Sequence, residues 1–378
     1  MHISWRRYTA MLLAVVICCS AFAASAGGGK RLKLQSDAAI VIDQATGRTV
    51  YEDGSTLKRY PASTTKIMTC LLALEDGHMD RVVTVSHNAA NVESTQLHEG
   101  DQMTMKEMLY EMMLVSDNGA AIAIAESIAG SVPAFADRMN RRAHDLGMGD
   151  TRFVNPNGLH NDRHFSSARD IAKLARAAME RRDFREIVGT KRREITWITP
   201  NKTAVLLNTN ELLGKYQGMT GIKTGYTDLA GGCLASGAER GKTKLVAVVL
   251  HAPDEDSRFT DTRKLLDYGF DHLKDEPGRR ADDMEQSVWI AGGDTWHVHA
   301  RPKTDLTYPV LKGERHDEFT VKYDIPRFVN APVKAGDEVG YVVLQHKGKE
   351  VCRVPLLADG NVQEGFSLVG RLLHFFFG

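Results

Sequence analysis

The sequence has no excess of charge of either sign. Its 48 Lys and Arg side chains balance 48 Asp and Glu side chains over 378 residues. A protein that binds nucleic acid through its overall charge carries a basic surplus. The composition therefore excludes a polyanion-binding class, and we expect no nucleic-acid partner.

Cysteine is scarce, with five residues in the whole chain. Cys18 and Cys19 lie in an N-terminal apolar stretch, which leaves Cys70, Cys233 and Cys352. An odd number of cysteines in a chain that is 43% hydrophobic is not a disulfide framework. We expect buried thiols, with a Cys70–Cys233 bridge as an open alternative.

Metal-binding patterns are also missing. The sequence contains no His-Glu-x-x-His motif. His297 and His299 would share one face of a strand, but no third ligand lies nearby in the sequence. We therefore expect neither a metal nor another cofactor.

The N-terminal apolar run, TAMLLAVVICCSAFA, is too short to span a bilayer comfortably. Arg6 and Arg7 precede it, and Ala24-Ser25-Ala26 follows as a cleavage signal. These features predict that residues 1–26 are a secretory signal peptide and that the protein is exported from the cytoplasm. An uncleaved anchor is the alternative. Removal of the two arginines leaves 46 basic against 48 acidic side chains.

Strand patterns lie at both ends of residues 31–275, and helical patterns lie between them. AAIVIDQATGRTVYEDG predicts a β-hairpin, and residues 219–250 predict three further strands. Apolar helical spacing begins at residue 62 and recurs up to the serine-capped segment SSARDIAKLARAAMERRDF. This order favours one α+β domain whose sheet combines both ends of the segment.

The last hundred residues have a different pattern. DEPGRRADD is polar and typical of a linker, and residues 284–363 alternate short β runs with turns, which predicts a small all-β sandwich. In residues 364–378 the tail GFSLVGRLLHFFFG has a narrow polar stripe of Ser367, Arg371 and His374. As a helix it would span roughly 21 Å, which is less than the roughly 30 Å hydrocarbon core. We expect an amphipathic membrane contact, with packing against the β domain as the alternative.

The stretch GSTLKRYPASTTKIMT contains Ser-x-x-Lys twice. Pro61 disfavours a helix that starts at Ser55, so Ser55 and Lys58 are expected to be ordinary surface residues. Ser63 instead lies in the first turn of the apolar helix, where Lys66 shares its face. Desolvation would lower the pKa of Lys66 toward that of a useful base.

Two further motifs strengthen this interpretation. Ser116-Asp117-Asn118 interrupts an apolar helical region with a hydroxyl and an amide. Lys223-Thr224-Gly225, on a predicted strand, combines a cation and a hydroxyl with a glycine that permits close approach of a ligand. Ser86-His87-Asn88 also fits Ser-x-Asn, but it follows a strand and we discount it.

Taken in order, these motifs resemble those of the penicillin-recognising serine acyl-transferases. PASTTKIMT, VSDNGAAIAIAE and GIKTGYTDLAG are similar to the low-molecular-mass penicillin-binding proteins that are D-alanyl-D-alanine carboxypeptidases, peptidase family S11. The resemblance covers about residues 35–362. It implies a β-lactamase/transpeptidase-like domain, an antiparallel sheet with helices on both sides, followed by the β sandwich.

The resemblance also implies a chemistry. Ser63 would attack the penultimate D-alanine carbonyl of a peptidoglycan stem peptide, Lys66 would take its proton and Ser116 would pass it to the leaving amine. Asn118 would hold the substrate amide. β-Lactam antibiotics would acylate the same serine.

Other residues would bind the substrate. Lys223 and Thr224 would bind the terminal carboxylate, with Arg258 nearby. The glycine of that motif, Gly225, would let the substrate approach, and the backbone N–H groups of Ser63 and Tyr226 would form the oxyanion hole.

Four rival functions remain. A class A β-lactamase needs a glutamate after Ser-Asp-Asn, but MGDTRFVNPNGLHNDRH contains none. A D,D-endopeptidase or transpeptidase would share the acyl-enzyme chemistry. An inactive wall-binding protein would not need the intact motif residues.

Overall fold

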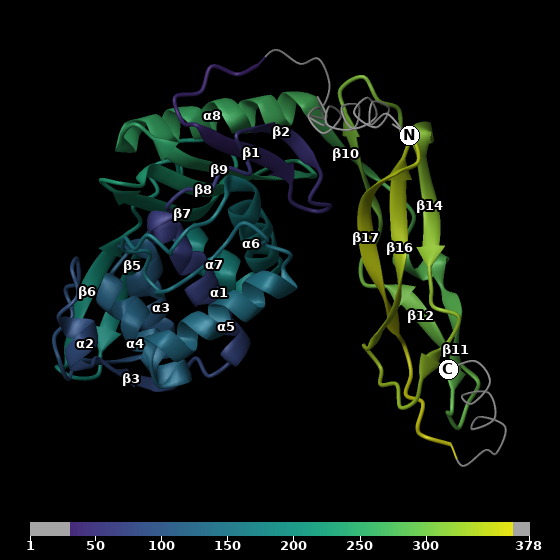
Figure 1. Ribbon diagram of the computed structural model, residues 1–378, viewed down its shortest axis with the longest axis horizontal. Coiled ribbons are helices and arrows are strands. Elements are labelled where there is room, and N and C mark those ends of the chain that lie inside the picture. Colours follow the sequence, from purple (N-terminus) through teal and green to yellow (C-terminus); the bar gives the residue numbers. More distant parts are fainter. Residues whose placement is uncertain (1–30, 366–378) are drawn as a thin grey trace, which may run out of the picture. The chain divides into compact units, whose positions relative to one another are not determined.

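The computed structural model describes residues 31–365 (Figure 1). The predicted signal peptide, residues 1–26, and residues 366–378 of the predicted tail lie outside the described residues. Among the residues described, no single helix is long and apolar enough to cross a membrane. The helices Asn118–Ala129 and Val132–Asp145, which meet at an 84° bend, have the required length and composition only when they are taken together.

A five-stranded antiparallel sheet forms the centre of the first domain. Its strand order, β2-β1-β9-β8-β7, places the N-terminal hairpin beside strands that come some 200 residues later. All six residues of β1 are buried. The predicted α+β fold is therefore confirmed. The strands are β1 (Ala38–Asp43), β2 (Thr49–Asp53), β7 (Met219–Thr227), β8 (Gly231–Arg240) and β9 (Thr243–Ala252).

Helices cover both faces of this sheet, as predicted (Figure 1). One face packs against α8, whereas α6 packs on β1 and β9 from the other face. The polar triplet at residues 116–118 does interrupt the helical middle, because α3 ends at Leu114 and Asp117 caps the next helix. The helices are α1 (Lys66–Asp76), α2 (His87–Ala90), α3 (Met105–Leu114), α4 (Asn118–Ala129), α5 (Val132–Asp145), α6 (Ala168–Glu180), α7 (Arg182–Gly189) and α8 (Glu255–His272).

Two small two-stranded sheets in the helical region were only partly foreseen. The run RVVTVS contains β3, but its partner and the β5–β6 pair were not predicted. These strands are β3 (Val82–Thr84), β4 (Gln102–Thr104), β5 (Arg192–Trp197) and β6 (Lys202–Leu207).

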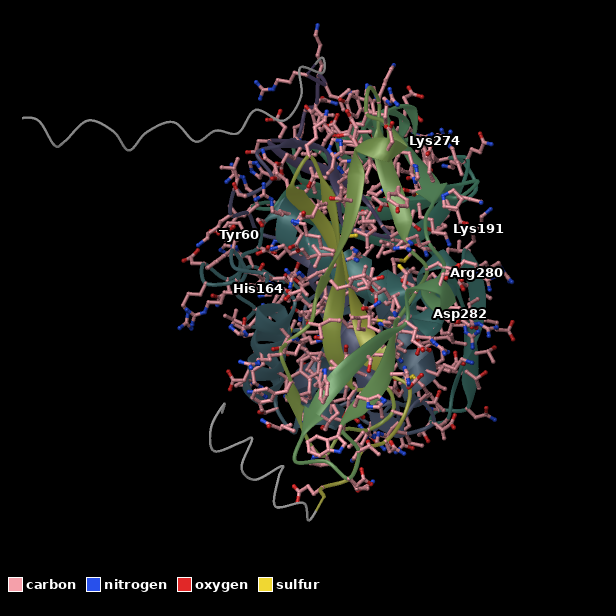
Figure 2. All side chains as sticks on the ribbon, turned by 90° about the vertical axis from the view of Figure 1, so that its right-hand side faces the viewer. Tyr60, His164, Lys191, Lys274, Arg280 and Asp282 are labelled. Carbon is pink, nitrogen blue, oxygen red and sulfur yellow. The ribbon has the colours of Figure 1, made fainter. Side chains whose placement is uncertain are left out.

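The second domain is all-β, as predicted, with a six-stranded sheet of order β14-β16-β17-β12-β11-β15. The stretch expected to be a linker overlaps β10, which follows α8 directly and pairs with β13. Lys274, Arg280 and Asp282 extend into solvent along this stretch (Figure 2). The elements are β10 (Leu273–Pro277), η2 (Ala281–Met284), β11 (Gln286–Ala291), β12 (His297–Pro302), β13 (Thr307–Leu311), η3 (His316–Glu318), β14 (Phe319–Asp324), β15 (Val329–Asn330), β16 (Glu338–His346) and β17 (Lys349–Ala358).

The structure corrects the prediction for Ser55 and decides between the alternatives for Cys70 and Cys233. Ser55 is not a surface residue, because it is 5% exposed and donates a 2.6 Å hydrogen bond to Glu52. Cys70 and Cys233 are both free and buried, which excludes the bridge between them.

Candidate active site

Ser63 lies in a short 3-10 turn, η1 (Ala62–Thr65), and not in the first turn of the α-helix as expected. Pro61 precedes the turn, and α1 begins at Lys66. Ala62 adopts a φ of 45°, a strained value for a residue with a Cβ. In this turn Ser63 is half-buried, whereas its neighbours Ala62, Thr64 and Thr65 are buried. The turn therefore presents the Ser63 side chain outward.

Lys66 lies directly behind this serine. Its Nζ is 2.9 Å from Ser63 Oγ, 2.6 Å from Asn118 Oδ1 and 2.7 Å from the carbonyl oxygen of Asn157. The residue is fully buried, and desolvation, aided by the charge of Lys223, holds the pKa of Lys66 well below its usual value. As a neutral amine, Nζ can donate to the two carbonyl oxygens and turn its lone pair toward the Ser63 hydroxyl. This geometry is that of a general base beside its nucleophile.

The Ser-Asp-Asn triplet holds the other side of this group. Asn118 accepts from Lys66 and donates through Nδ2 to the carbonyl oxygen of Glu93 at 2.8 Å, which fixes the orientation of its amide. Asp117 caps α4 and also accepts hydrogen bonds from Thr95 and Gln96. Within the described chain, the Ser116 hydroxyl has no hydrogen-bond partner, and its φ is 67°. It is free to interact with a substrate.

Strand β7 approaches the serine from the opposite side. A Cβ built on Gly225 would lie 2.9 Å from Ser63 N and 3.2 Å from Thr64 N, so only glycine allows this approach. β7 is also an edge strand of the sheet, so the backbone groups on its outer side are unpaired within the sheet. The next residue, Tyr226, is 43% exposed at the cavity.

Two buried basic side chains lie beside this site, Lys223 on β7 itself and Arg258 on α8. Lys223 is 1% exposed, and desolvation together with Arg258 lowers its pKa to about 7. Thr224 shares a 2.7 Å hydrogen bond with Thr209. Arg258, 5% exposed, donates to the Gly225 carbonyl oxygen at 2.9 Å and to Glu255 at 2.5 Å. This end of the site is suited to a carboxylate.

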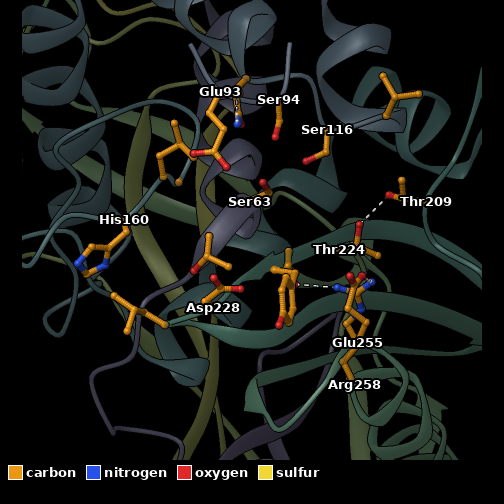
Figure 3. Close-up of a pocket in the computed structure, with 18 residues that line it drawn as sticks. Ser63, Glu93, Ser94, Ser116, His160, Thr209, Thr224, Asp228, Glu255 and Arg258 are labelled. Atoms are coloured by element: carbon orange, nitrogen blue, oxygen red, sulfur yellow. Dashed lines mark hydrogen bonds and ion pairs between the residues drawn. The ribbon is translucent and has the colours of Figure 1, made fainter. Parts of the chain in front are cut away.

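These elements enclose an open cavity of about 610 Å³ (Figure 3). The structure thus brings together all the residues that the sequence singled out: Ser63, Ser116, Asn118, Thr224, Gly225, Tyr226 and Arg258 line the cavity, and Lys66 and Lys223 lie buried behind its wall. The sequence did not identify Glu93, Ser94, His160, Thr209, Asp228, Leu229 and Glu255, which also line it. Glu93, Ser94, His160 and Thr209 come from loops between the motifs. Asp228 and Leu229 lie within GIKTGYTDLAG and Glu255 begins α8, but no pattern assigned them a role. Asn157 and its neighbour Gly158 lie in the stretch MGDTRFVNPNGLHNDRH, in which no pattern indicated a role for them.

A buried histidine supports the turn from below. His164 Nδ1 accepts from Val154 N at 3.1 Å, so the other ring nitrogen carries the proton and bonds Thr65 Oγ1 at 2.8 Å. Burial lowers the pKa of His164 to about 4, which keeps the ring neutral. No group of three or more residues able to hold a metal occurs in the described part of the chain.

Comparisons with known proteins agree with this geometry. Residues 23–254 match the family of D-alanyl-D-alanine carboxypeptidases, and residues 279–364 match the C-terminal domain of penicillin-binding protein 5. The D-alanyl-D-alanine carboxypeptidase DacF of Bacillus subtilis (strain 168) is 32% identical over 346 residues, which is 89% of each chain. DacC of Escherichia coli (strain K12) is 30% identical over 89% of this chain and 86% of its own.

Solved structures give the same result. Penicillin-binding protein 5 of Haemophilus influenzae superposes with a TM-score of 0.68 and 26% identity, covering 89% of this chain and all of its own. The Streptomyces K15 DD-transpeptidase covers 64% of this chain and all of its own, with a TM-score of 0.61 and 30% identity. The two-domain architecture matches the first protein, and the catalytic domain alone matches the second.

Proposed function

This chain belongs to the D-alanyl-D-alanine carboxypeptidase family, and from that premise we propose that it removes the terminal D-alanine from peptidoglycan stem pentapeptides through an acyl-enzyme on Ser63. One observation carries the proposal: Lys66 Nζ lies 2.9 Å from Ser63 Oγ, and β7 packs closely against the turn that presents this serine. The reaction is a serine-type hydrolysis.

Acylation begins when Ser63 Oγ attacks the carbonyl carbon of the penultimate D-alanine. The neutral amine of Lys66 takes the hydroxyl proton, and its low pKa makes this form available. Ser116 then donates its hydroxyl proton to the nitrogen of the leaving D-alanine and receives in its place the proton that Lys66 took from Ser63, so Lys66 returns to the neutral amine. The amide bond breaks, and the rest of the peptide stays attached to Ser63 as an ester.

The substrate is held at both ends of the scissile bond. Asn118 orients Lys66 and offers its remaining amide N–H to the substrate backbone. Lys223, Thr224 and Arg258 bind the terminal carboxylate. The developing oxyanion accepts hydrogen bonds from the backbone N–H groups of Ser63 and Tyr226, whose removal typically costs about 3 kcal/mol of transition-state stabilisation.

Water then hydrolyses the ester, with Lys66 as the base. Penicillins acylate Ser63 in the same way, because the β-lactam amide replaces the D-alanyl-D-alanine bond. Residues 148–164 contain no glutamate that could activate a second water, so the penicilloyl ester is released slowly. This distinguishes the protein from a class A β-lactamase.

A D,D-endopeptidase activity on cross-linked peptides would use the same acyl-enzyme. The solved structure named as a DD-transpeptidase that superposes on the catalytic domain makes acyl transfer to an amine the other reaction to test. The two rivals differ from the proposal in the products that they form.

Mass analysis of a stem pentapeptide after incubation with the enzyme tests the proposal. We expect a product shorter by one D-alanine, and no product from Ser63→Ala. Cross-linked dimers and an amine acceptor are supplied in parallel reactions. Cleavage of the dimer, or transfer to the amine, without loss of D-alanine from the pentapeptide would contradict the carboxypeptidase assignment.

We also propose that the protein acts outside the cytoplasm, at the outer face of the membrane. The support is the sequence alone: the signal-like residues 1–26 and the apolar tail 365–378. Deletion of residues 365–378 should move the enzyme from the membrane fraction to the soluble fraction. An unchanged distribution would contradict the anchoring role of the tail.

A further inference from the structure

The second domain exposes two tryptophans at one end of a hairpin. Trp289 on β11 is 61% exposed, and Trp296, which precedes β12, is 46% exposed. Trp197 of the first domain, in contrast, is 4% exposed. Tryptophan is the largest apolar side chain, and most soluble domains bury the greater part of it.

The register of the hairpin fixes the exposure of Trp289. β11 and β12 are antiparallel, and Trp289 lies opposite His297 in the pair nearest the turn. The adjacent residues Val288 and Val298 point into the core of the domain and are buried. Because side chains alternate along a strand, Trp289 must point to the outer face. No rearrangement within the sheet could bury it without exposing the core residues.

The turn of this hairpin is bonded to the segment that leads into the tail. Asp294 N donates to the Gln363 carbonyl oxygen at 2.9 Å, and Gln363 N donates to Asp294 Oδ1 at 3.1 Å. Gly365 N donates to the Gly292 carbonyl oxygen at 2.8 Å. Gly365 is the first residue of the tail GFSLVGRLLHFFFG. A surface that binds the start of the tail therefore also lies beside the two tryptophans.

The charges around the hairpin do not favour a polyanion. Asp294 and Glu364 lie at the turn, and on the outer face Glu285 pairs with Arg301 at 2.5 Å and contacts His299 at 3.2 Å. The exposed chemistry is that of indole rings, which are apolar with one N–H donor. Such rings are enriched at the head-group level of phospholipid bilayers.

We propose that Trp289 and Trp296 form a second contact with the phospholipid bilayer, next to the tail. This inference rests on the proposed anchoring of the tail and adds a folded element of the second domain to it. The contact depends on indole partitioning and not on lipid charge, so it forms on zwitterionic phosphatidylcholine and persists at high salt.

Tryptophan fluorescence can test this contact directly. A protein that starts after residue 26 has three tryptophans, Trp197, Trp289 and Trp296, of which the first is buried. The protein is mixed with phosphatidylcholine vesicles that carry bromine on the acyl chains, and with matched vesicles without bromine. We expect bromine to quench most of the emission from Trp289 and Trp296. Vesicle sedimentation measures binding in the same samples.

Matched variants distinguish the contribution of the two tryptophans to vesicle binding from that of the tail. Trp289→Ser/Trp296→Ser should bind vesicles about tenfold more weakly, because linked contacts act multivalently, and should lose the quenching. Tyr323→Ser, which removes an exposed aromatic from β14, should behave like the wild type. Penicillin labelling of Ser63 in each variant shows that the protein is folded.

Three outcomes would overturn the proposal. Vesicle binding without quenching would leave the tail as an anchor and remove the hairpin from the bilayer. No binding by the unaltered protein would overturn both membrane contacts, while activity on the pentapeptide would remain as the test of the catalytic function. A fluorescence response to soluble wall glycan, but not to vesicles, would assign the tryptophans to a sugar.

Discussion

Lys66 and Lys223 are both fully buried lysines, but the proposed chemistry needs them in opposite charge states. Lys66 must be neutral to take a proton from Ser63, and its pKa is lowered well below the usual value. Lys223 must be charged to hold a carboxylate, and its pKa is lowered to about 7. The pH at which the enzyme works is therefore limited by Lys66 on the acid side and by Lys223 on the alkaline side.

The titration of Lys223 on the alkaline side gives a prediction for the KM of peptides that end in a free carboxylate. Above about pH 7, Lys223 loses its proton and its positive charge, so KM should rise with pH, by up to about tenfold per unit. Lys223→Arg keeps the charge and should flatten the profile. Steady-state kinetics from pH 6 to 9 measure it, with a peptide amidated at its C-terminus as the control. An equally steep rise for the amide would contradict the role of Lys223.

Glu255 gives a second prediction, because it forms an ion pair with Arg258, which a substrate carboxylate would also bind. Its Oε2 is 2.5 Å from Arg258 Nη2, and its side chain is 57% exposed. Solvent at the exposed Glu255 carboxylate screens its attraction to the buried Arg258, so we take the pair to contribute about 1 kcal/mol or less, as an exposed pair does. Glu255→Gln should therefore lower KM by up to about fivefold with kcat unchanged. Asp228→Asn, another carboxylate at the cavity, is the control for charge alone. A higher KM in Glu255→Gln would show that Glu255 positions Arg258 and does not compete with the substrate.

At this scale the sequence predicted the motif residues but not their neighbours. Ser63 and Lys66 were recognisable because residues three positions apart in a helix lie on the same face. The Asn157 carbonyl that completes the bonds of Lys66 is a backbone group, and Thr209 contacts Thr224 from a loop. Contacts of these kinds depend on the tertiary fold and leave no local pattern.

Among the elements, the close packing of η1 on β7 determines the position of the nucleophile. Gly225→Ala would place a Cβ 2.9 Å from Ser63 N. We expect β7 to move away from the serine and acylation to slow by about 10²–10³-fold, the usual cost of a lost oxyanion donor. Stopped-flow measurement with a fluorescent penicillin gives this rate.

Gly149→Ala is the matched control for the glycine substitution. Its Cβ would meet no atom within 4 Å. We expect the control to acylate at the wild-type rate and both variants to unfold at similar temperatures. Acylation of Gly225→Ala within twofold of the wild type would show that the close approach of β7 is not required.

The 3-10 turn at Ser63 shows why this element could not be predicted in full. The apolar spacing from residue 62 onward fits an α-helix, and α1 does follow from Lys66. Ala62 has a positive φ, however, and a Cβ on Gly158 would lie 1.9 Å from the Ala62 carbonyl oxygen. Packing against a loop nearly a hundred residues away therefore shapes the turn, and periodicity does not report such packing.

For the whole molecule, the order of strands and helices predicted the architecture more reliably than any single boundary. Strands at both ends of one segment implied a sheet that joins them, and β1 does pair with β9. The register and the edge position of β7 were not predictable, because both depend on which strands become neighbours. The stretch expected to be a linker overlaps β10, since the pairing of β10 with β13 outweighs the polar composition of the stretch.

The most direct test of the central claim is peptide mapping after exposure to benzylpenicillin. Trypsin separates the two Ser-x-x-Lys copies, because Lys58 and Arg59 lie between them. We predict one penicilloyl group per protein, located on YPASTTK, residues 60–66, and absent from Ser63→Ala. Ser55→Ala should be labelled like the wild type if it folds normally. A penicilloyl group on the peptide that contains Ser55, or labelling that persists in Ser63→Ala, would contradict the account.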